Sequence, residues 1–290
     1  MTASAPRVVD AGDALTAVLG EARRDGRTVA LVPTMGALHD GHLALVREAR
    51  RRADVVVVSI FVNPTQFGPG EDLDRYPRTF DADVAALTGH ADVVLHPGVE
   101  QMYPDGPQTP GVTVDPGPLG SVLEGSVRPT HFAGVLTVVA KLFGLVRPDV
   151  AVFGEKDYQQ LVLIRQMARR LCLGVEVVGC PTVREPDGLA LSSRNRYLDA
   201  EQRGLAAALA EALRAADAEA AHGASDALAA AKTVLAARPG VDVDYLVVRS
   251  PDLDDAVDGR PARILVAAKV GDTRLIDNLP LDLGSREETR

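Results

Sequence analysis

The sequence predicts an α/β protein in which a doubly wound parallel sheet is followed by a smaller α+β domain at the C-terminus. Three observations support this prediction. Short apolar runs alternate with helical patterns up to about residue 180, an alanine-rich stretch follows a turn near 184–188, and strand-like runs lie beyond it. Strands that alternate with helices form parallel sheets with helices on both faces, whereas consecutive strands favour antiparallel pairing.

The first predicted domain, residues 1–184, contains several strand-like runs. The residues at 54–62 form an almost continuous β-branched run, which is typical of a strand buried on both faces. Shorter strand-like runs lie at 29–32, 91–96, 150–153 and 175–178, and apolar residues at helical spacing lie at 43–49, 132–142 and 161–171. In Rossmann-like sheets of this kind ligands bind at the carboxyl ends of the strands, so the residues after each strand are the candidate site residues.

The second predicted domain, residues 185–290, begins after a turn that contains proline and glycine. The stretch at 204–237 is rich in alanine, the best helix former, and predicts two helices broken near Gly223. The runs at 243–248, 263–268 and 273–276 predict a small antiparallel sheet.

The composition argues against several functional classes. The 290 residues carry a net charge of −9, which argues against a nucleic-acid partner. No apolar run approaches the roughly 20 residues of a membrane span, and the first residues have no apolar core typical of a signal peptide. We therefore expect a cytoplasmic protein without a membrane partner. Cys172 and Cys180 form no CxxC pair, and we expect both to be buried as small apolar side chains.

The residues from Pro33 to His42 follow the first predicted strand and open a helix near Gly41. A helix N-terminus presents unpaired N–H groups and a partial positive charge, which suits phosphate. His39 and His42 are three residues apart, so both imidazoles can point the same way and donate to phosphoryl oxygens. Capping or surface histidines are the alternative. A zinc site is weaker still, because no CxxC or HExxH pattern supplies further ligands.

Two more strand ends carry candidate polar residues. Asn63 and Gln66 can hydrogen-bond a small polar substrate, although a plain turn would be the better interpretation of that segment alone. Lys156 follows the strand at 150–153 and is one of four lysines among 31 basic residues. A mobile ammonium there can reach phosphates, and Asp157 can cap the next helix. A salt-bridged surface loop is the alternative.

A fourth segment, Ser192-Ser193-Arg194-Asn195, places two hydroxyls and a guanidinium in succession. Such a set can clamp phosphate oxygens. A helix-capping turn is the alternative, since serine pairs are common there.

These segments resemble known families. His39-Asp40-Gly41-His42 resembles the HxGH signature of the nucleotidyltransferase superfamily that includes class I aminoacyl-tRNA synthetases. The longer string PTMGALHDGH, with FVNPTQF, GEKDYQQ and SSRN further along, resembles the pantothenate synthetase (pantoate–β-alanine ligase) family. The resemblance runs from about Leu31 to Leu198 and is looser beyond, where it implies a lid-like domain. Leu191 stands where many relatives have methionine, a swap that conserves volume. The lysines of the KMSKS loop are absent, which counts against a tRNA synthetase.

The resemblance implies roles for individual residues. The implied catalytic residues are His39, His42, Lys156, Ser192, Ser193 and Arg194. The implied ATP-binding residues are Met35, Gly41, His42, Lys156, Asp157, Val183, Ser192, Ser193 and Arg194. The implied pantoate-binding residues are Pro33, Met35, Gln66, Phe67 and Gln160. Asp83 is the candidate ligand for Mg²⁺, Glu124 and Arg128 are candidate nucleotide-cleft residues, and we interpret His90, His96 and His222 as structural.

The function that the resemblance implies is ATP-dependent condensation of pantoate with β-alanine through a pantoyl adenylate, in a homodimer. The sequence contains no GxSxG pattern, which fits direct adenylyl transfer without a serine nucleophile. Two alternatives remain open. Another nucleotidyltransferase of the same fold would keep the nucleotide in its product, and a non-catalytic regulator would bind ATP without turnover.

Overall fold

The computed structural model describes residues 4–109 and 111–285. Its internal contacts divide the chain into two compact units. The first unit comprises the residues up to 154 together with 159–181, and the second comprises 155–158 and the residues from 182 onward. The predicted domains, 1–184 and 185–290, placed the division slightly later and assigned 155–158 to the first part.

The first unit is an α/β sheet structure. Its elements are β1 (Arg7–Val9), α1 (Asp13–Arg24), β2 (Val29–Thr34), α2 (Asp40–Arg52), β3 (Val55–Ile60), η1 (Pro64–Gln66), α3 (Phe80–Ala86), β4 (Val93–Leu95), α4 (Val99–Met102), η2 (Pro118–Ser121), α5 (Glu124–Val127), α6 (His131–Val146), β5 (Val150–Gly154), α7 (Tyr158–Arg170) and β6 (Glu176–Cys180). Helix α7 begins at the border, because Tyr158 groups with the second unit.

The six strands lie in the order β1-β4-β3-β2-β5-β6, and all neighbours are parallel. The prediction of a doubly wound sheet is confirmed. The chain proceeds from β2 outward to β3 and β4 and then returns to place β5 on the other side of β2, so the strand order reverses there. Strand β2 pairs with β3 from Val29 to Thr34 but with β5 only at Ala30 and Leu31. The carboxyl ends of β2 and β5 therefore separate at the switch point, where ligands of such sheets bind.

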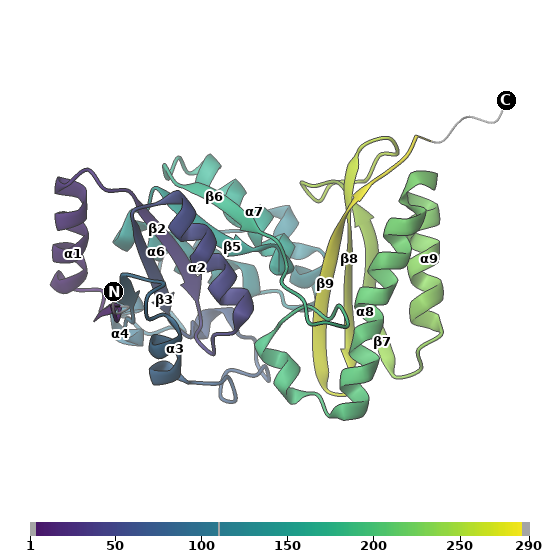
Figure 1. Ribbon diagram of the computed structural model, residues 1–290, viewed down its shortest axis with the longest axis horizontal. Helices are drawn as coiled ribbons and strands as arrows, with labels where there is room; N and C mark the ends of the chain where they lie inside the picture. Colours follow the sequence, from purple (N-terminus) through teal and green to yellow (C-terminus); the bar gives the residue numbers. More distant parts are fainter. Residues whose placement is uncertain (1–3, 110, 286–290) are drawn as a thin grey trace. The chain divides into compact units, whose positions relative to one another are not determined.

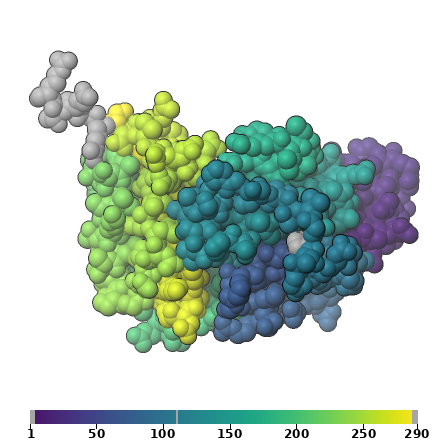
Figure 2. Space-filling view, turned by 180° about the vertical axis from the view of Figure 1, so that it is seen from behind, coloured from purple at the N-terminus to yellow at the C-terminus, as the bar shows by residue number. Residues whose placement is uncertain are grey.

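Apolar packing explains why these segments fold as predicted. All of β3 is buried, as its β-branched run predicts. Helix α2 crosses one face of the sheet and packs Leu45, Val46 and Ala49 into a core with residues of β2, β3 and β5 (Figure 1). Part of the connection from β4 to α6 is visible on the face that Figure 2 shows, whereas Met102, Tyr103 and Glu124 of the same connection are buried.

The second unit contains a three-stranded antiparallel sheet and two long helices. Its elements are η3 (Glu155–Asp157), η4 (Ser193–Tyr197), α8 (Ala200–Glu219), η5 (Ala220–His222), α9 (Ala224–Ala236), β7 (Val241–Arg249), β8 (Pro261–Val270) and β9 (Thr273–Asp282). The strands lie in the order β7-β8-β9. Ile264, Val266 and Ala268 of β8 join leucine and alanine side chains of α8 and α9 in one core, so the helices cover one face of the sheet (Figure 1).

Several sequence-based expectations need correction. The strand expected at 273–276 continues to Asp282. Cys180 is buried as expected, but Cys172 is exposed, because it lies with a φ of 54° in the turn that follows α7. The strand expected at 29–32 continues through Pro33 to Thr34, and the strand expected at 54–62 ends at Ile60, before Pro64 begins η1. Strand β1 and helix α1 were not predicted. Among the described residues, no helix combines the length and apolar character that crossing a membrane requires.

Candidate active site

The HxGH segment caps helix α2. His39 is the N-cap residue, and its Nδ1 accepts a hydrogen bond from the backbone N–H of Gly41 at 3.2 Å. His42 returns the interaction, because its Nδ1 accepts from the backbone N–H of His39 at 3.3 Å. The two histidines thus form a reciprocal capping arrangement in which imidazoles replace the usual serine and glutamate.

This arrangement fixes the tautomers of both rings. A ring nitrogen that accepts a hydrogen bond carries no proton, so each neutral imidazole holds its proton on Nε2. The centroids of the two rings are 4.1 Å apart. His39 and His42 therefore present two Nε2–H donors side by side at the positive end of α2, which is a suitable place for phosphoryl oxygens.

Asp83 holds the loop that leads into these histidines. Its carboxylate is 3% exposed and accepts the backbone N–H groups of Ala37 at 3.0 Å and Leu38 at 2.8 Å. The hydroxyl of Thr79 donates to both carboxylate oxygens at 3.2 Å. Gly36 has a φ of +81°, and a Cβ there would lie 3.0 Å from the Asp83 carboxylate. The conformation of the loop thus depends on glycine at 36 and a carboxylate at 83.

Asn63 and Gln66 belong to a buried polar cluster. The Oδ1 of Asn63 accepts from the hydroxyls of Tyr103 at 2.7 Å and Thr65 at 3.0 Å. The Nδ2 of Asn63 donates to Oε1 of Gln66 at 3.0 Å. Because that oxygen is engaged, the amide nitrogen of Gln66 points toward Met35, whose sulfur it meets at 3.3 Å. The residues implied for pantoate, Met35 and Gln66, are therefore in contact.

Gly134 permits the close approach of helix α6 to this cluster. A Cβ at this position would lie 2.3 Å from the carbonyl oxygen of Thr65 and 2.7 Å from the backbone nitrogen of Gln66. No side chain can be accommodated at such distances without moving η1. Glycine at 134 therefore lets the carbonyl of Gly134 accept the second Asn63 hydrogen bond, at 3.2 Å.

Arg128 and His131 support the backbone of Gln66 from the other side. The Nδ1–H of His131 donates to the carbonyl oxygen of Gln66 at 2.9 Å, and Nε2 lies 3.2 Å from Nη1 of Arg128. Arg128 also pairs with the carboxylate of Glu71. Burial, reinforced by the Arg128 charge, lowers the pKa of His131 from 6.5 to about 4. Burial is the largest single influence on Glu71 and alone would raise its pKa, but the hydrogen bond and the charge of Arg128, with smaller contributions from His131 and Gly68, together lower the net pKa.

The buried His131 makes the stability of the protein depend on pH. Its folded pKa of about 4 is below the unfolded value of 6.5, so the unfolded chain takes up the proton first as the pH falls. The stabilisation is complete above pH 6.5 and is lost toward pH 4. Relative to His131→Gln, which cannot titrate, the wild type should lose about 2–3 kcal/mol between pH 6.5 and 4.5. Urea unfolding of both proteins measures this difference; parallel pH profiles would contradict it.

Lys156 lies in η3, in a short segment that groups with the second unit. Its Nζ is 3.7 Å from Oδ1 of Asp157, and its side chain is 20% exposed. The backbone carbonyls of Glu155 and Lys156 both accept hydrogen bonds from the Asn278 side chain in β9. Lys156 is thus held by its backbone, while its ammonium end makes a loose ion pair.

The segment Ser192–Asn195, here called the serine segment, is held by the turn that precedes it. The hydroxyl of Ser192 accepts the backbone N–H of Arg194 at 3.3 Å, so Ser192 caps η4, as the structural alternative expected. The amide of Asn195 donates to Ala190 and Glu185 at 3.1 Å each, and its Oδ1 is buried without a partner. A serine hydroxyl that accepts from the backbone still has its own proton to donate.

The structure groups the predicted site residues in two sets. In the first unit lie Pro33, Met35, His39, Gly41, His42, Gln66, Phe67 and Gln160, and in the second lie Lys156, Asp157, Val183, Ser192, Ser193 and Arg194. Phe67 packs edge to face against Tyr76, with their ring centroids 6.1 Å apart. Sequence reasoning missed Asp277 and Asn278; the available signal was two adjacent polar residues between the apolar residues Ile276 and Leu279.

A magnesium site has less structural support than the phosphate-binding residues described above. Among the described residues, no three His, Cys, Asp or Glu side chains gather closely enough to hold a metal. Both oxygens of Asp83, the predicted ligand, already accept the hydrogen bonds of Ala37, Leu38 and Thr79. Magnesium in phosphate-transfer sites is often held by the phosphates with only one or two carboxylates, so the ion stays a prediction.

The family model described as Pantoate-beta-alanine ligase matches residues 7–280 of the chain. The chain belongs to this family. A pantothenate synthetase of a Nocardioides species is 62% identical over 98% of this chain and 87% of its own length. The pantothenate synthetase of Mycolicibacterium smegmatis is 59% identical over 93% of this chain and 86% of its own length. The chain is accordingly an enzyme of the pantoate–β-alanine ligase family.

Solved structures of this family have the same fold. A crystal structure of the pantothenate synthetase from Thermus thermophilus is 51% identical, with a TM-score of 0.87 over 94% of this chain and 98% of that one. The pantoate–β-alanine ligase of Francisella tularensis, whose crystal structure is complexed with beta-gamma ATP and β-alanine, is 34% identical. Its TM-score is 0.77 over 95% of this chain and 97% of that one.

Proposed function

We propose that this enzyme forms pantothenate in two steps through a pantoyl adenylate and releases pyrophosphate and AMP. Family membership supports pantoate and β-alanine as substrates, and the Francisella tularensis relative is described with an ATP compound and β-alanine. The observation that carries the adenylyl-transfer proposal is the reciprocal capping of His39 and His42, which provides two Nε2–H donors at the start of α2.

In the first step a carboxylate oxygen of pantoate attacks the α-phosphorus of ATP. The bond from that phosphorus to the bridging oxygen breaks, and pyrophosphate leaves. Negative charge moves toward the β- and γ-phosphates, where hydrogen-bond donors and cations lower the barrier. His39 and His42 supply imidazole N–H donors, Lys156 supplies an ammonium, and Ser192, Ser193 and Arg194 supply hydroxyls and a guanidinium. None of them forms a covalent bond.

In the second step the neutral amine of β-alanine attacks the acyl carbon of the adenylate. The amide bond forms as the bond between the acyl carbon and the phosphate oxygen breaks, the proton that the amine loses passes to solvent, and AMP leaves with an oxygen that belonged to pantoate. This reaction needs positioning more than covalent help. We assign pantoate to the Met35–Gln66 contact, with Pro33 and Phe67 against its methyl groups and Gln160 as a further polar contact. The hydrogen bond from Gln66 to the sulfur of Met35 supports this assignment.

Three further features belong to the same proposal. Mg²⁺ would accompany ATP and neutralise its phosphates, with the phosphates as principal ligands. We also propose that the enzyme is a homodimer and acts in the cytoplasm, where ATP is available.

Incubation of the protein with ATP, pantoate and β-alanine tests the proposal. AMP should accumulate only when both co-substrates are present, and omission of β-alanine should limit pyrophosphate to about one equivalent per enzyme. A nucleotidyltransferase of another specificity would release pyrophosphate but keep the nucleotide in its product. A regulator would bind ATP without turnover. Either result would refute the ligase function.

A further inference from the structure

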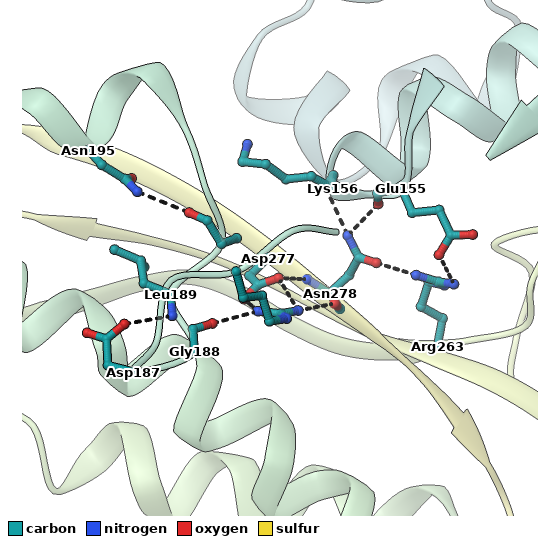
Figure 3. Close-up of polar contacts among 11 residues, drawn as sticks. Glu155, Lys156, Asp187, Gly188, Leu189, Asn195, Arg263, Asp277 and Asn278 are labelled. Carbon is teal, nitrogen blue, oxygen red and sulfur yellow. Dashed lines mark hydrogen bonds and ion pairs between the residues drawn. The ribbon is translucent and has the colours of Figure 1, made fainter. Parts of the chain in front are cut away.

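The side chain of Asn278 in β9 is bonded to the segment that carries Lys156. Its Nδ2 donates to the carbonyl oxygens of Glu155 and Lys156, at 2.9 Å each (Figure 3). Asn278 is 3% exposed. One side-chain amide thus uses both of its N–H groups to hold two successive peptide carbonyls.

The orientation of this amide is fixed by Arg263. The guanidinium donates to Oδ1 of Asn278, and because arginine can only donate, the amide nitrogen must face the two carbonyls. Arg263 also pairs with the carboxylate of Glu155 at 3.1 Å, and its guanidinium lies 3.8 Å from the ring centroid of Tyr158. The hydroxyl of Tyr158 donates to the carbonyl of Pro251 at 2.9 Å. The segment 155–158 is therefore anchored to the second unit at several points.

The neighbouring residue of β9 holds the serine segment. Asp277 pairs with Val266 of β8 on the sheet face that the helices cover, whereas Asn278 pairs with Leu265 on the opposite face. The carboxylate of Asp277 accepts both ends of the Arg184 guanidinium, at 2.6 and 2.9 Å. Arg184 also donates to the carbonyls of Gly188 and Asn278.

The turn held by Arg184 leads directly to the serines. Arg184 forms an isolated β-bridge with Ala190, and the backbone N–H of Leu191 donates to the carbonyl of Val183 at 2.9 Å. The amide of Asn195 closes the turn by bonding to Ala190 and Glu185. The start of the Ser192–Arg194 segment is thus tied through Arg184 to Asp277.

We infer that the Asp277–Asn278 pair of β9 is a positioning element for adenylyl transfer, with Asn278 holding Lys156 and Asp277 holding the serine segment. Neither residue touches substrate in this account. Two adjacent residues of one strand, with side chains on opposite faces, set the spacing of two phosphate-binding segments that are far apart in sequence. This inference rests on the proposed role of Lys156, because a lysine without that role would need no such support.

The conservative substitution Asn278→Asp tests it. Aspartate keeps an oxygen for Arg263 but replaces the two N–H donors with an oxygen that repels the carbonyls of Glu155 and Lys156. A misplacement of about 1 Å can lower a rate by roughly 100-fold, so we expect kcat for pyrophosphate release from ATP and pantoate to fall about 10- to 100-fold. The KM for pantoate should change less than two- to three-fold, because Met35 and Gln66 belong to the first unit, whereas Asn278 holds a segment of the second unit.

A double-mutant cycle separates positioning from general damage. Because Asn278 acts through Lys156, the double variant Lys156→Ala/Asn278→Asp should be no slower than Lys156→Ala by more than about two-fold. Independent effects would multiply instead. The matched control is Asp244→Asn, which weakens the ion pair with Arg274 of β9, four residues away from Asn278. Its kcat should stay within about two-fold of the wild type.

The outcomes are distinct. If Lys156→Ala is slow but Asn278→Asp keeps wild-type kcat, or if the two effects multiply, the positioning inference is wrong and the proposed function stands. If Lys156→Ala itself turns over normally, the proposed role of Lys156 fails. If thermal unfolding shows that Asn278→Asp does not fold, Asn278→Ser, whose single hydroxyl can hold only one carbonyl, takes its place. A wild-type kcat in that variant overturns the inference, and a loss that is absorbed by Lys156→Ala supports it.

Discussion

Replacement of Lys156 by alanine is expected to slow pyrophosphate release from ATP and pantoate by roughly 10²–10³-fold. The ammonium of Lys156 would otherwise neutralise charge that develops on the phosphates in the transition state. The fold should tolerate the change, because the side chain is partly exposed and its ion pair with Asp157 is long at 3.7 Å. The free energy of unfolding should change by less than about 1 kcal/mol.

The matched control for this variant is Lys232→Ala, which removes an exposed lysine from helix α9 of the same unit. It should leave the rate of pyrophosphate release unchanged. The two variants should unfold at similar urea concentrations. Near-wild-type release by Lys156→Ala would remove this residue from the mechanism, and equal losses in both variants would point to a general effect of charge.

Two substitutions of His39 should separate its capping function from its chemical function. In His39→Asn, a side-chain oxygen can accept the N–H of Gly41 as the imidazole does, and asparagine is a preferred N-cap residue. This variant should be as stable as the wild type, but it lacks a donor at the place of Nε2. Loss of such a donor is expected to lower the rate by roughly 10²–10³-fold.

His39→Gln should have the opposite effects: it keeps a hydrogen-bond donor near the place of Nε2 but loses the helix cap. The amide nitrogen of glutamine can reach about as far as Nε2 but caps the helix poorly. Unfolding should become easier by about 1 kcal/mol, while the rate should fall less than in His39→Asn. Urea unfolding ranks the two variants by stability, and single-turnover pyrophosphate release ranks them by rate. If the variants rank the same way in stability and rate, His39 acts only as a helix cap.

The parallel sheet and the strand-end motifs could be predicted from the sequence because their signals are local. A continuous run such as 54–62 indicates a buried strand, and the residues after it must lie at the edge of the sheet. Strand β1 could not be predicted in this way, because its three residues are too short for a pattern and depend on pairing with β4. The exposure of Cys172 depends on where α7 ends, which its apolar neighbours do not reveal.

The supports of the candidate site were less predictable than the site residues themselves. Asp83 was a candidate metal ligand in the sequence, yet it is buried and holds the backbone of Ala37 and Leu38. The predicted strand stopped at Ile276, so Asp277 and Asn278 lay outside it. Both are satisfied by partners about 90 to 120 residues away in sequence, Arg184 and Lys156. Such partners become visible only when the fold brings them together.

Transfer of an oxygen atom from pantoate to AMP tests most directly the central claim that the reaction passes through a pantoyl adenylate. Pantoate with ¹⁸O in its carboxylate is incubated with ATP, β-alanine and the enzyme, and the products are analysed by mass spectrometry. A pantoyl adenylate requires that AMP leave with one oxygen from pantoate, so AMP should carry one ¹⁸O atom and no ADP should form. Unlabelled AMP, or ADP with labelled phosphate, would contradict the account.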